Sequence, residues 1–358
     1  MRSISVSLMC MDVNVENDIS FLSSKSDYFH FDIIDNDFSL CEGLDPLLIS
    51  DLRKQSSAKL DVHIMSKKPL KYIEFCIENK CEMITWHVES EVDTRYAIDL
   101  IHKNGLKAGL AIRPDTKIEK LYPFLDYTDL INVMLVYPGP AGQAFQKEEL
   151  QKVVELKEIR NKKGYSFLIE IDGSCNESHY HSIDCAGPDI CVVGTSGLFS
   201  LDKDLSAAWL KMENYMSQKT TIFMHADKVG NPLKEGIKTW LIKMGYEVVD
   251  LYTDGEMEYP ECAKNLSSYV LGNEYNMGLL FCGTGLGMSI AANKVKGIRA
   301  AVVSDVYSAK MSRQHNDANV LCLGSRVIAL EYGINIVEEF LKSNFLFGKH
   351  TPRVDRIQ

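Results

Sequence analysis

Short apolar runs alternate with stretches of helical spacing through the first part of the chain. The runs are rich in β-branched and aromatic residues, which favour strands. They span residues 4–10, 28–34, 59–65, 83–89, 107–112, 130–136, 167–172 and 190–197. Eight such strands alternating with helices predict an α/β fold of the (β/α)8 type, a TIM barrel, whose chemistry lies at the carboxyl ends of the strands.

A second series of strand-like runs begins after "AAWLKMENYMSQK". These runs span residues 220–226, 246–252, 277–283, 298–304 and 319–325, and a helical stretch follows each. Five strands with intervening helices are too few for another barrel and predict a small doubly wound, Rossmann-like α/β domain. We place the boundary near Lys219, which gives predicted domains of residues 1–218 and 219–358.

Composition narrows the class of protein. A chain of 358 residues, 46% of them hydrophobic, is long enough for two packed domains. Its ten cysteines are scattered and no signal-peptide pattern precedes them, which predicts a reduced, cytoplasmic protein. No run approaches the roughly 18 apolar residues of a membrane span. The net charge of −10 argues against non-specific nucleic-acid binding, so an anionic substrate requires local attracting groups.

Polar residues lie in or at the ends of several apolar strands of the predicted barrel. His30 and Asp32 are two residues apart and share one face of a strand, while His63, His87 and Asp172 lie on other strands. Two histidines and two carboxylates suit a divalent metal such as Zn²⁺, Fe²⁺, Mn²⁺ or Co²⁺. The alternative is that buried histidines at strand ends only satisfy local hydrogen bonds. The four candidate ligands are His30, Asp32, His63 and Asp172.

Glycine-rich loops follow the last three strands of the predicted barrel. They read "PGPAG" at residues 138–142, "DGS" at residues 172–174 and "GTS" at residues 194–196. Loops in this place commonly hold phosphate through backbone N–H groups and a helix N-terminus. Each glycine cluster by itself is typical of a tight turn, whereas their joint placement favours a phosphate site.

The stretches "SLMCMD", "DYFHFDIID", "LDVHIM", "PGPAGQAF", "EIDGSCN" and "VGTSGLF" carry a family resemblance. Together they resemble the ribulose-phosphate 3-epimerase family, and more closely its allulose-6-phosphate 3-epimerase branch. The resemblance implies one divalent metal ion on the four candidate ligands, with Asp32 and Asp172 moving protons on opposite faces of C3. Asn36 and Arg113 depart from the family pattern without belonging to the metal set. The substrate-binding and phosphate-binding residues implied are Ser7, His63, Gly139, Ala141, Gly142, Gly173, Ser174, Gly194, Thr195 and Ser196.

The stretch "FCGTGLGMSIAAN" places Cys282 before three alternating glycines and the start of a helix. It lacks the G-x-G-x-x-G spacing of dinucleotide sites, and no second cysteine stands at C-x-x-C spacing. Two interpretations remain. Cys282 is either a small buried apolar residue or a thiolate favoured by a helix N-terminus, with glycine N–H groups ready to hold an oxyanion.

The longer stretch from "FCGTGLG" through "SRQHND" to "GSRVI" is similar to the type B ribose-5-phosphate isomerase family over roughly residues 220–358. The resemblance implies that Cys282 moves a proton between C1 and C2 and that His315 opens the sugar ring. It implies no cofactor, and an active site between two subunits, hence at least a homodimer. Lys228 and Lys349 stand where the family usually has His and Arg. The supporting and substrate-binding residues implied are Gly283, Thr284, Gly285, Gly287, Asp227, Lys228, Asn316, Arg326, Lys349 and Arg353.

The two resemblances together predict a bifunctional sugar-phosphate enzyme. The second domain would convert allose 6-phosphate to allulose 6-phosphate, and the barrel would convert that product to fructose 6-phosphate. The alternative is the pentose version, which links ribose 5-phosphate, ribulose 5-phosphate and xylulose 5-phosphate. A third hypothesis makes one half a non-catalytic sugar-phosphate-binding or assembly module.

Overall fold

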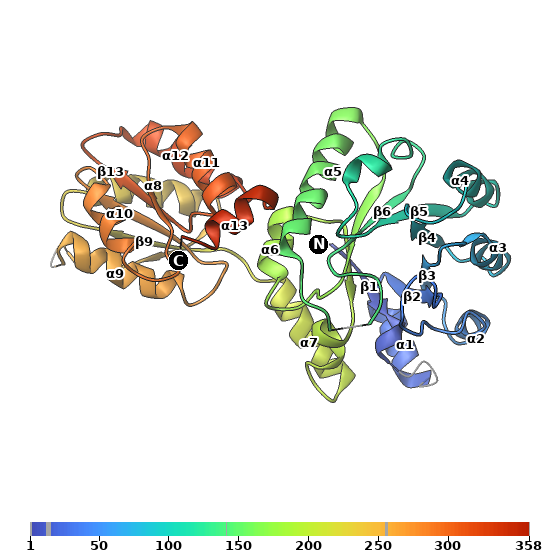
Figure 1. Cartoon of the computed structure of the whole chain (residues 1–358). Helices are drawn as coiled ribbons and strands as arrows, with labels where there is room; N and C mark the ends of the chain where they lie inside the picture. The colour runs from blue at the N-terminus through green and yellow to red at the C-terminus, as the bar shows by residue number, and fades with distance from the viewer. Residues whose placement is uncertain (1, 12–15, 141, 255–256, 358) are drawn as a thin grey trace. The chain divides into compact units, whose positions relative to one another are not determined.

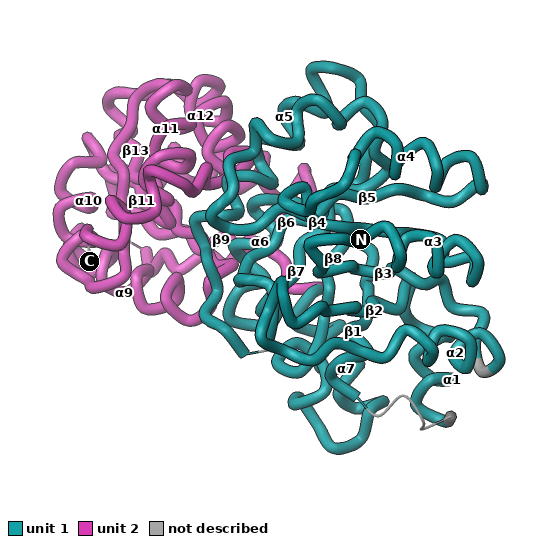
Figure 2. The backbone as a smooth tube through the Cα atoms, turned by 45° about the vertical axis from the view of Figure 1, so that its right-hand side comes forward, with its two compact units in different colours: residues 1–216 teal, residues 217–358 magenta. Residues whose placement is uncertain are grey.

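The computed structural model describes residues 2–11, 16–140, 142–254 and 257–357. The chain forms two compact units, Met1–Met216 and Ser217–Gln358, shown in different colours in Figure 2. Each unit has its own sheet and its own core. The sequence placed the boundary near Lys219, and the structure divides the chain between residues 216 and 217.

The first unit is a closed barrel of eight parallel strands in chain order. Figure 1 shows helices packed around the outside of these strands. The predicted TIM barrel is therefore confirmed. Its strands are β1 (Ser3–Ser7), β2 (Tyr28–Ile34), β3 (Lys59–Met65), β4 (Met83–His87), β5 (Lys107–Ile112), β6 (Leu130–Met134), β7 (Leu168–Asp172) and β8 (Ile190–Val193).

Local sequence explains where the barrel helices begin and end. The side chain of Asp93 accepts a hydrogen bond from the backbone N–H of Tyr96 and so caps α4. Gly164 and Gly187 end α5 and α6 in the left-handed conformation that glycine adopts without strain. The helices are α1 (Glu16–Lys25), α2 (Leu48–Gln55), α3 (Leu70–Glu78), α4 (Thr94–Lys103), α5 (Leu150–Lys163), α6 (Tyr180–Ala186) and α7 (Leu205–Met216), with short 3-10 turns η1 (Leu8–Cys10), η2 (Ile118–Leu121) and η3 (Lys147–Glu149).

Four barrel strands end earlier than the hydrophobic pattern predicts, the fourth and sixth by two residues and the first and eighth by more. The first ends at Ser7, where the 3-10 turn η1 begins, and the eighth ends at Val193. A π turn, η4 (Thr195–Phe199), follows the eighth strand. Past the first strand the apolar run continues as Leu8, Met9 and Cys10, so hydrophobicity alone does not mark the point where the chain leaves the sheet there. Both turns lie at the carboxyl ends of their strands, where a barrel carries its site.

The second unit is a five-stranded parallel sheet with the order β10-β9-β11-β13-β12. Residues of α8 and α12 pack in one hydrophobic cluster, and residues of α9 and α10 pack in another. Along β11, Leu279 and Phe281 belong to the first cluster and Leu280 and Cys282 to the second, so the helices cover both faces of the sheet. The predicted doubly wound fold is confirmed. The strands are β9 (Thr221–Ala226), β10 (Glu247–Asp250), β11 (Met277–Cys282), β12 (Ala300–Val302) and β13 (Val320–Gly324).

The helices of the second unit are α8 (Asn231–Lys243), α9 (Tyr259–Val270), α10 (Leu286–Ala292), α11 (Val306–Asn316), α12 (Leu330–Lys342) and α13 (Thr351–Val354), with the 3-10 turn η5 (Gly348–His350). In the described part of the chain, no helix is long and apolar enough to cross a membrane.

Candidate active sites

Four side chains of the barrel converge at the carboxyl ends of β2, β3 and β7. His30 and Asp32 share one face of β2, Asp32 pairs in register with His63 on β3, and Asp172 ends β7. A ligand atom from each of the four lies within 4.8 Å of the others. Asp32 Oδ1 is 3.2 Å from His30 Nε2 and 3.3 Å from His63 Nδ1. The structure therefore brings the four candidate ligands together.

The donor atoms of this cluster fit a divalent cation. His30 Nε2, His63 Nδ1 and Asp32 Oδ1 are buried, and within the described residues none of them makes a hydrogen bond. Burial alone would raise the pKa of Asp32, but His30 and His63 hold it far below its usual range. Unpaired buried nitrogen and carboxylate oxygen atoms facing one another are the ligand set that Zn²⁺, Fe²⁺, Mn²⁺ and Co²⁺ accept.

A carboxylate supports His30 from behind. Asp61 Oδ2 lies 2.8 Å from His30 Nδ1 and accepts a hydrogen bond from Ser5 Oγ at 2.9 Å. This pairing places the His30 proton on Nδ1 and leaves the Nε2 lone pair for a ligand bond. Glu170 lies fully buried beside Asp61, and burial followed by the charge of Asp61 raises the pKa of Glu170 well above its usual range.

A second histidine and then a carboxylate lie behind His63. His63 Nε2 is 3.0 Å from His87 Nε2, and His87 Nδ1 is 3.2 Å from Glu89 Oε2. Burial lowers the pKa of His87 to about 4. Burial would raise the pKa of Glu89, but hydrogen bonding to His87 and the charge of His87 lower it to about 2. At neutral pH, His87 is thus a neutral imidazole and Glu89 a carboxylate.

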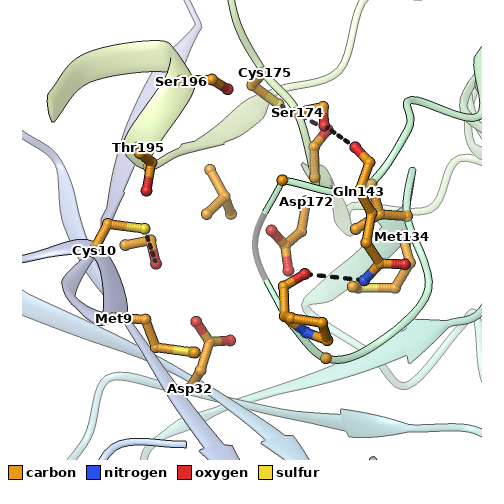
Figure 3. Close-up of a pocket in the computed structure, with 18 of the residues that line it drawn as sticks. Met9, Cys10, Asp32, Met134, Gln143, Asp172, Ser174, Cys175, Thr195 and Ser196 are labelled. Carbon is orange, nitrogen blue, oxygen red and sulfur yellow. Dashed lines mark hydrogen bonds between the residues drawn. The ribbon is translucent and has the colours of Figure 1, made fainter. Parts of the chain in front are cut away.

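A cavity of about 330 Å³ opens onto Asp32 and Asp172. Figure 3 shows both carboxylates pointing into it, with the hydroxyls of Ser174, Thr195 and Ser196 on other parts of its wall. Three methionines also line the cavity, Met9, Met65 and Met134. The volume lies at the lower end of the range for small-ligand pockets, so the cavity suits a small polar molecule that presents different groups to its ends.

The loops after β6, β7 and β8 meet around this cavity. Gly173 has a φ of +116°, and a Cβ there would lie 2.6 Å from Val136 Cγ2, so only glycine fits. Ser174 Oγ donates to the carbonyl of Gln143 at 2.9 Å, which ties the loop after β7 to the loop after β6. Ala141 lies outside the described residues. The predicted phosphate-binding residues that line the cavity are Ser7, Gly139, Gly142, Gly173, Ser174, Gly194, Thr195 and Ser196.

In the second unit, a cluster forms where the strand order reverses between β9 and β11. Cys282 ends β11 with its side chain 6% exposed, and the N–H of Gly285 donates to its Sγ at 3.1 Å. Asp227 follows β9 and accepts a hydrogen bond from the N–H of Gly230 at 2.7 Å. The Arg326 side chain reaches the chain next to Cys282, since a Cβ on Gly283 would lie 3.7 Å from Arg326 Cδ. We call Asp227, Cys282 and Arg326 the switch-point cluster. Ligands bind at such reversals in open α/β sheets.

The backbone around Cys282 is shaped by its glycines. Gly285 has a φ of +79° and precedes α10, and the Thr284 hydroxyl lies 3.4 Å from the N–H of Leu286. A Cβ on Gly287 would lie 2.7 Å from the ring of Tyr259, so this glycine permits the close packing of α9 against α10. Lys228 is exposed beside Asp227 in the chain.

A second group of predicted residues lies at the carboxyl end of α11 and around η5. The ring of His315 stacks on His350 at 4.3 Å between centroids, and Asn316 is the last residue of α11. Burial lowers the pKa of His350, and the positive charges of His315, Lys349 and Arg353 lower it further. We call His315, His350, Lys349 and Arg353 the cationic cluster. In the part of the chain that the structure describes, no hydrogen bond or ring contact joins it to the switch-point cluster.

Comparison with known families assigns both units. Residues 3–199 match the ribulose-phosphate 3 epimerase family, and residues 222–357 match the ribose/galactose isomerase family. The chain belongs to both families. Both contain sugar-phosphate isomerases or epimerases, so the chain is an enzyme of that kind. We refer to Met1–Met216 as the epimerase unit and to Ser217–Gln358 as the isomerase unit.

Individual relatives match one unit each. A ribulose-phosphate 3-epimerase of Aquifex aeolicus is 33% identical over 199 residues, which are 55% of this chain and 88% of that protein. Ribose-5-phosphate isomerase B of Escherichia coli is 47% identical over 133 residues, which are 37% of this chain and 89% of that protein. A solved ribose-5-phosphate isomerase B of Clostridium thermocellum is 45% identical and covers 38% of this chain and 94% of that chain, with a TM-score of 0.37.

Sequence reasoning missed several residues around the four candidate ligands His30, Asp32, His63 and Asp172, which we call the metal-ligand cluster. Asp61 and Glu89 were not predicted, and His87 was noted only as a polar residue on a strand. The signal was present, because "DVH" puts Asp61 two residues before His63 and "HVE" puts Glu89 two residues after His87. The pairing of His30 with Asp61 in register required the sheet. Neither of the two departures from the family pattern, Asn36 and Arg113, belongs to the four-ligand set.

Proposed function

We propose that this chain is a bifunctional enzyme in which the isomerase unit interconverts an aldose phosphate and a ketose phosphate, and the epimerase unit inverts C3 of the ketose. The observation that carries the epimerase half is that Asp32 and Asp172 both point into one cavity whose other walls are the predicted phosphate loops. The hydrogen-bonded Cys282 at the switch point supports the isomerase half.

Epimerisation at C3 requires removal of a proton from one face and its return to the other. In the proposal, Asp32 and Asp172 each act on one face as general base and general acid. Asp32 is ionised at neutral pH because its pKa is lowered, so it is able to accept a proton. A divalent cation on the four candidate ligands would supply positive charge beside the ketone oxygen and so acidify the neighbouring C–H. The N–H groups and hydroxyls of the three phosphate loops would hold the distant end of the substrate.

Aldose–ketose isomerisation moves a proton between C1 and C2. We assign this transfer to Cys282, because its sulfur lies at the end of β11 at the switch point and accepts a hydrogen bond from the N–H of Gly285. Thr284 and the glycine amides that follow Cys282 would hold the oxygen on which negative charge develops. His315 would open the sugar ring, and Lys349 and Arg353 would bind the phosphate as cations.

We further propose that the isomerase unit works as a homodimer whose site combines two subunits. Within the described residues of one chain, no hydrogen bond or ring contact joins the switch-point cluster to the cationic cluster. Several apolar side chains of this unit are exposed, among them Leu286 at 55%, Ile290 at 63% and Tyr307 at 70%. A second copy would cover such residues. The ten free cysteines agree with a reducing, cytoplasmic location for both reactions.

For the substrate, we propose allose 6-phosphate, with allulose 6-phosphate passed from the isomerase unit to the epimerase unit and fructose 6-phosphate as the final product. The stretches "SLMCMD", "DGSCN" and "GTSGLF" favour the hexose branch of the family, and residues from each, among them Ser7, Ser174 and Thr195, line the epimerase cavity. Backbone holds the phosphate in the proposal, so the distance from phosphate to Asp32 and Asp172 is fixed. A hexose phosphate is one carbon longer than a pentose phosphate, and a fixed distance discriminates between them.

A pentose version is the second candidate, because the relatives described above are named ribose-5-phosphate isomerase B and ribulose-phosphate 3-epimerase. Steady-state kinetics of the purified chain separate the two. We expect the epimerase to prefer allulose 6-phosphate over ribulose 5-phosphate by at least about tenfold in kcat/KM, or about 1.4 kcal/mol at the transition state. A preference for ribulose 5-phosphate would reject the hexose assignment in favour of the pentose one.

A further inference from the structure

An unbroken series of side-chain contacts runs from the metal-ligand cluster to the edge of the barrel. His63 Nδ1 faces Asp32 and Asp172, and His63 Nε2 lies 3.0 Å from His87 Nε2. His87 Nδ1 lies 3.2 Å from Glu89 Oε2. Both rings are fully buried, whereas the Glu89 side chain is 13% exposed. Buried polar groups that hydrogen-bond in series must share their protons in a consistent order.

The order follows from the nitrogen that faces the ligand cluster. A nitrogen that binds a cation carries no proton, so a neutral His63 that binds through Nδ1 carries its proton on Nε2. That proton points at His87 Nε2, which must therefore accept it. The proton of His87 is then on Nδ1, and there it faces the Glu89 carboxylate, which only accepts hydrogen bonds. Every donor in the series has an acceptor in this arrangement alone.

We propose that Glu89, acting through His87, is a positioning residue that holds His63 in the tautomer needed for metal binding. The inference rests on the proposed metal site, and it assigns Glu89 and His87 no contact with substrate. His30 is held by Asp61 directly at 2.8 Å, so each ligand histidine has its own carboxylate. Outer partners of this kind fix the tautomer and the orientation of metal-binding histidines.

The surroundings of Glu89 keep it an acceptor in a fixed place. The backbone N–H of Arg113 donates to Glu89 Oε1 at 3.1 Å, and the Thr116 hydroxyl also hydrogen-bonds to the carboxylate. The ring of Phe38 packs on His87 with centroids 4.8 Å apart. Arg113 therefore touches this series through its backbone, while its side chain pairs with Asp115. The residue type at position 113 is free to differ from its family without loss of this hydrogen bond.

Glu89→Gln tests the tautomer argument because it keeps the shape and changes the donor pattern. Gln has one oxygen and one NH₂, and the backbone N–H of Arg113 requires the oxygen. The NH₂ group then faces His87 Nδ1 and donates to it. His87 must move its proton to Nε2, His63 must accept at Nε2, and the proton of His63 then occupies the ligand nitrogen Nδ1. The substitution should thus reverse the whole series.

The readout is Co²⁺ and Zn²⁺ affinity of the full-length chain stripped of metal, measured by competition with a chelator, together with the visible spectrum of the Co²⁺ form. We expect Glu89→Gln to weaken binding by about 10–100-fold and to alter the Co²⁺ spectrum. Glu91→Gln is the matched control, since Glu91 is exposed two residues away and the same chemical change there should leave affinity and spectrum unchanged.

The possible outcomes separate the two hypotheses. If the unaltered chain binds no divalent cation, the proposed metal site itself fails. If it binds, and Glu89→Gln binds equally well with the same spectrum, the positioning role is wrong. Nitrogen-15 NMR of the histidines in the Zn²⁺-loaded, unsubstituted chain gives a test that needs no variant. We expect His87 protonated at Nδ1 and His63 at Nε2, and a His87 proton on Nε2 would overturn the proposal.

Discussion

The two carboxylates of the epimerase cavity should have separable roles, and substitution of one at a time distinguishes them. Asp172 Oδ2 lies 3.7 Å from His30 Nε2 and 3.6 Å from His63 Nδ1, and the side chain is 18% exposed. Asp172→Asn keeps the shape and one oxygen but removes the charge and the capacity to exchange a proton. Asp32→Asn makes the same change on the other carboxylate.

The size of the effect follows from what is lost. A positioned acid or base contributes about 10²–10⁴ in rate, and each aspartate is also one of four candidate ligands. We therefore expect kcat/KM for epimerisation to fall by at least about 10³ in either variant, or about 4 kcal/mol in the transition state. Aldose–ketose isomerisation should stay within about twofold of the unsubstituted chain, because Cys282 belongs to the other compact unit.

Isotope exchange gives the sharper assay. In D₂O, a variant that keeps one base should still exchange the C3 proton of the epimer whose proton faces that base, while net inversion stops. Proton NMR of each ketose phosphate epimer follows both processes. We expect Asp172→Asn to exchange the C3 proton of one epimer and Asp32→Asn to exchange the C3 proton of the other. If both variants exchange the C3 proton of the same epimer, or if either inverts C3 at the normal rate, the assignment of one carboxylate to each face is refuted. Circular dichroism and the intact isomerase activity control for folding.

Three further predictions test the rest of the assignment. A chelator should abolish epimerisation and spare isomerisation, and metal analysis that finds no divalent ion in active enzyme would contradict this. Cys282→Ala and His315→Ala should each lack isomerase activity. After subunit exchange, an equimolar mixture of the two should recover about a quarter of the activity of the unsubstituted chain, because half of the random dimers then hold one complete site of two. A mixture that stays inactive although exchange is shown would reject the shared site. In metal-free protein, burial lowers the pKa of His87 to about 4. As pH falls, His87 is therefore protonated in the unfolded state before it is protonated in the folded state. The epimerase unit should lose about 2 kcal/mol of unfolding free energy between pH 7 and pH 4.5 through this group. If urea unfolding shows that the unfolding free energy of His87→Gln depends on pH as steeply as that of the unsubstituted chain, this prediction is wrong.

Much of the fold was readable from the chain because local and global signals agree. Alternation of apolar strand runs with helical stretches predicted both the barrel and the doubly wound sheet, which the structure and the family matches confirm. Spacing also found candidate residues, since His30 and Asp32 are two apart on one strand and must share a face. The end of the first strand was not predicted, because its apolar residues continue into the turn η1.

By itself, the sequence determined which residue types stand at the carboxyl ends of which strands. That is enough to predict where polar groups gather, because parallel strands all end at the same edge. Only the tertiary structure decided which nitrogen of each histidine faces the ligand cluster and what lies behind it. Asp61 reaches His30, and Glu89 reaches His63 through His87, only because neighbouring strands are aligned in register. Whether side chains of neighbouring strands form a hydrogen bond depends on differences of a few tenths of an ångström in their distance. The order of residues along one chain does not contain those distances.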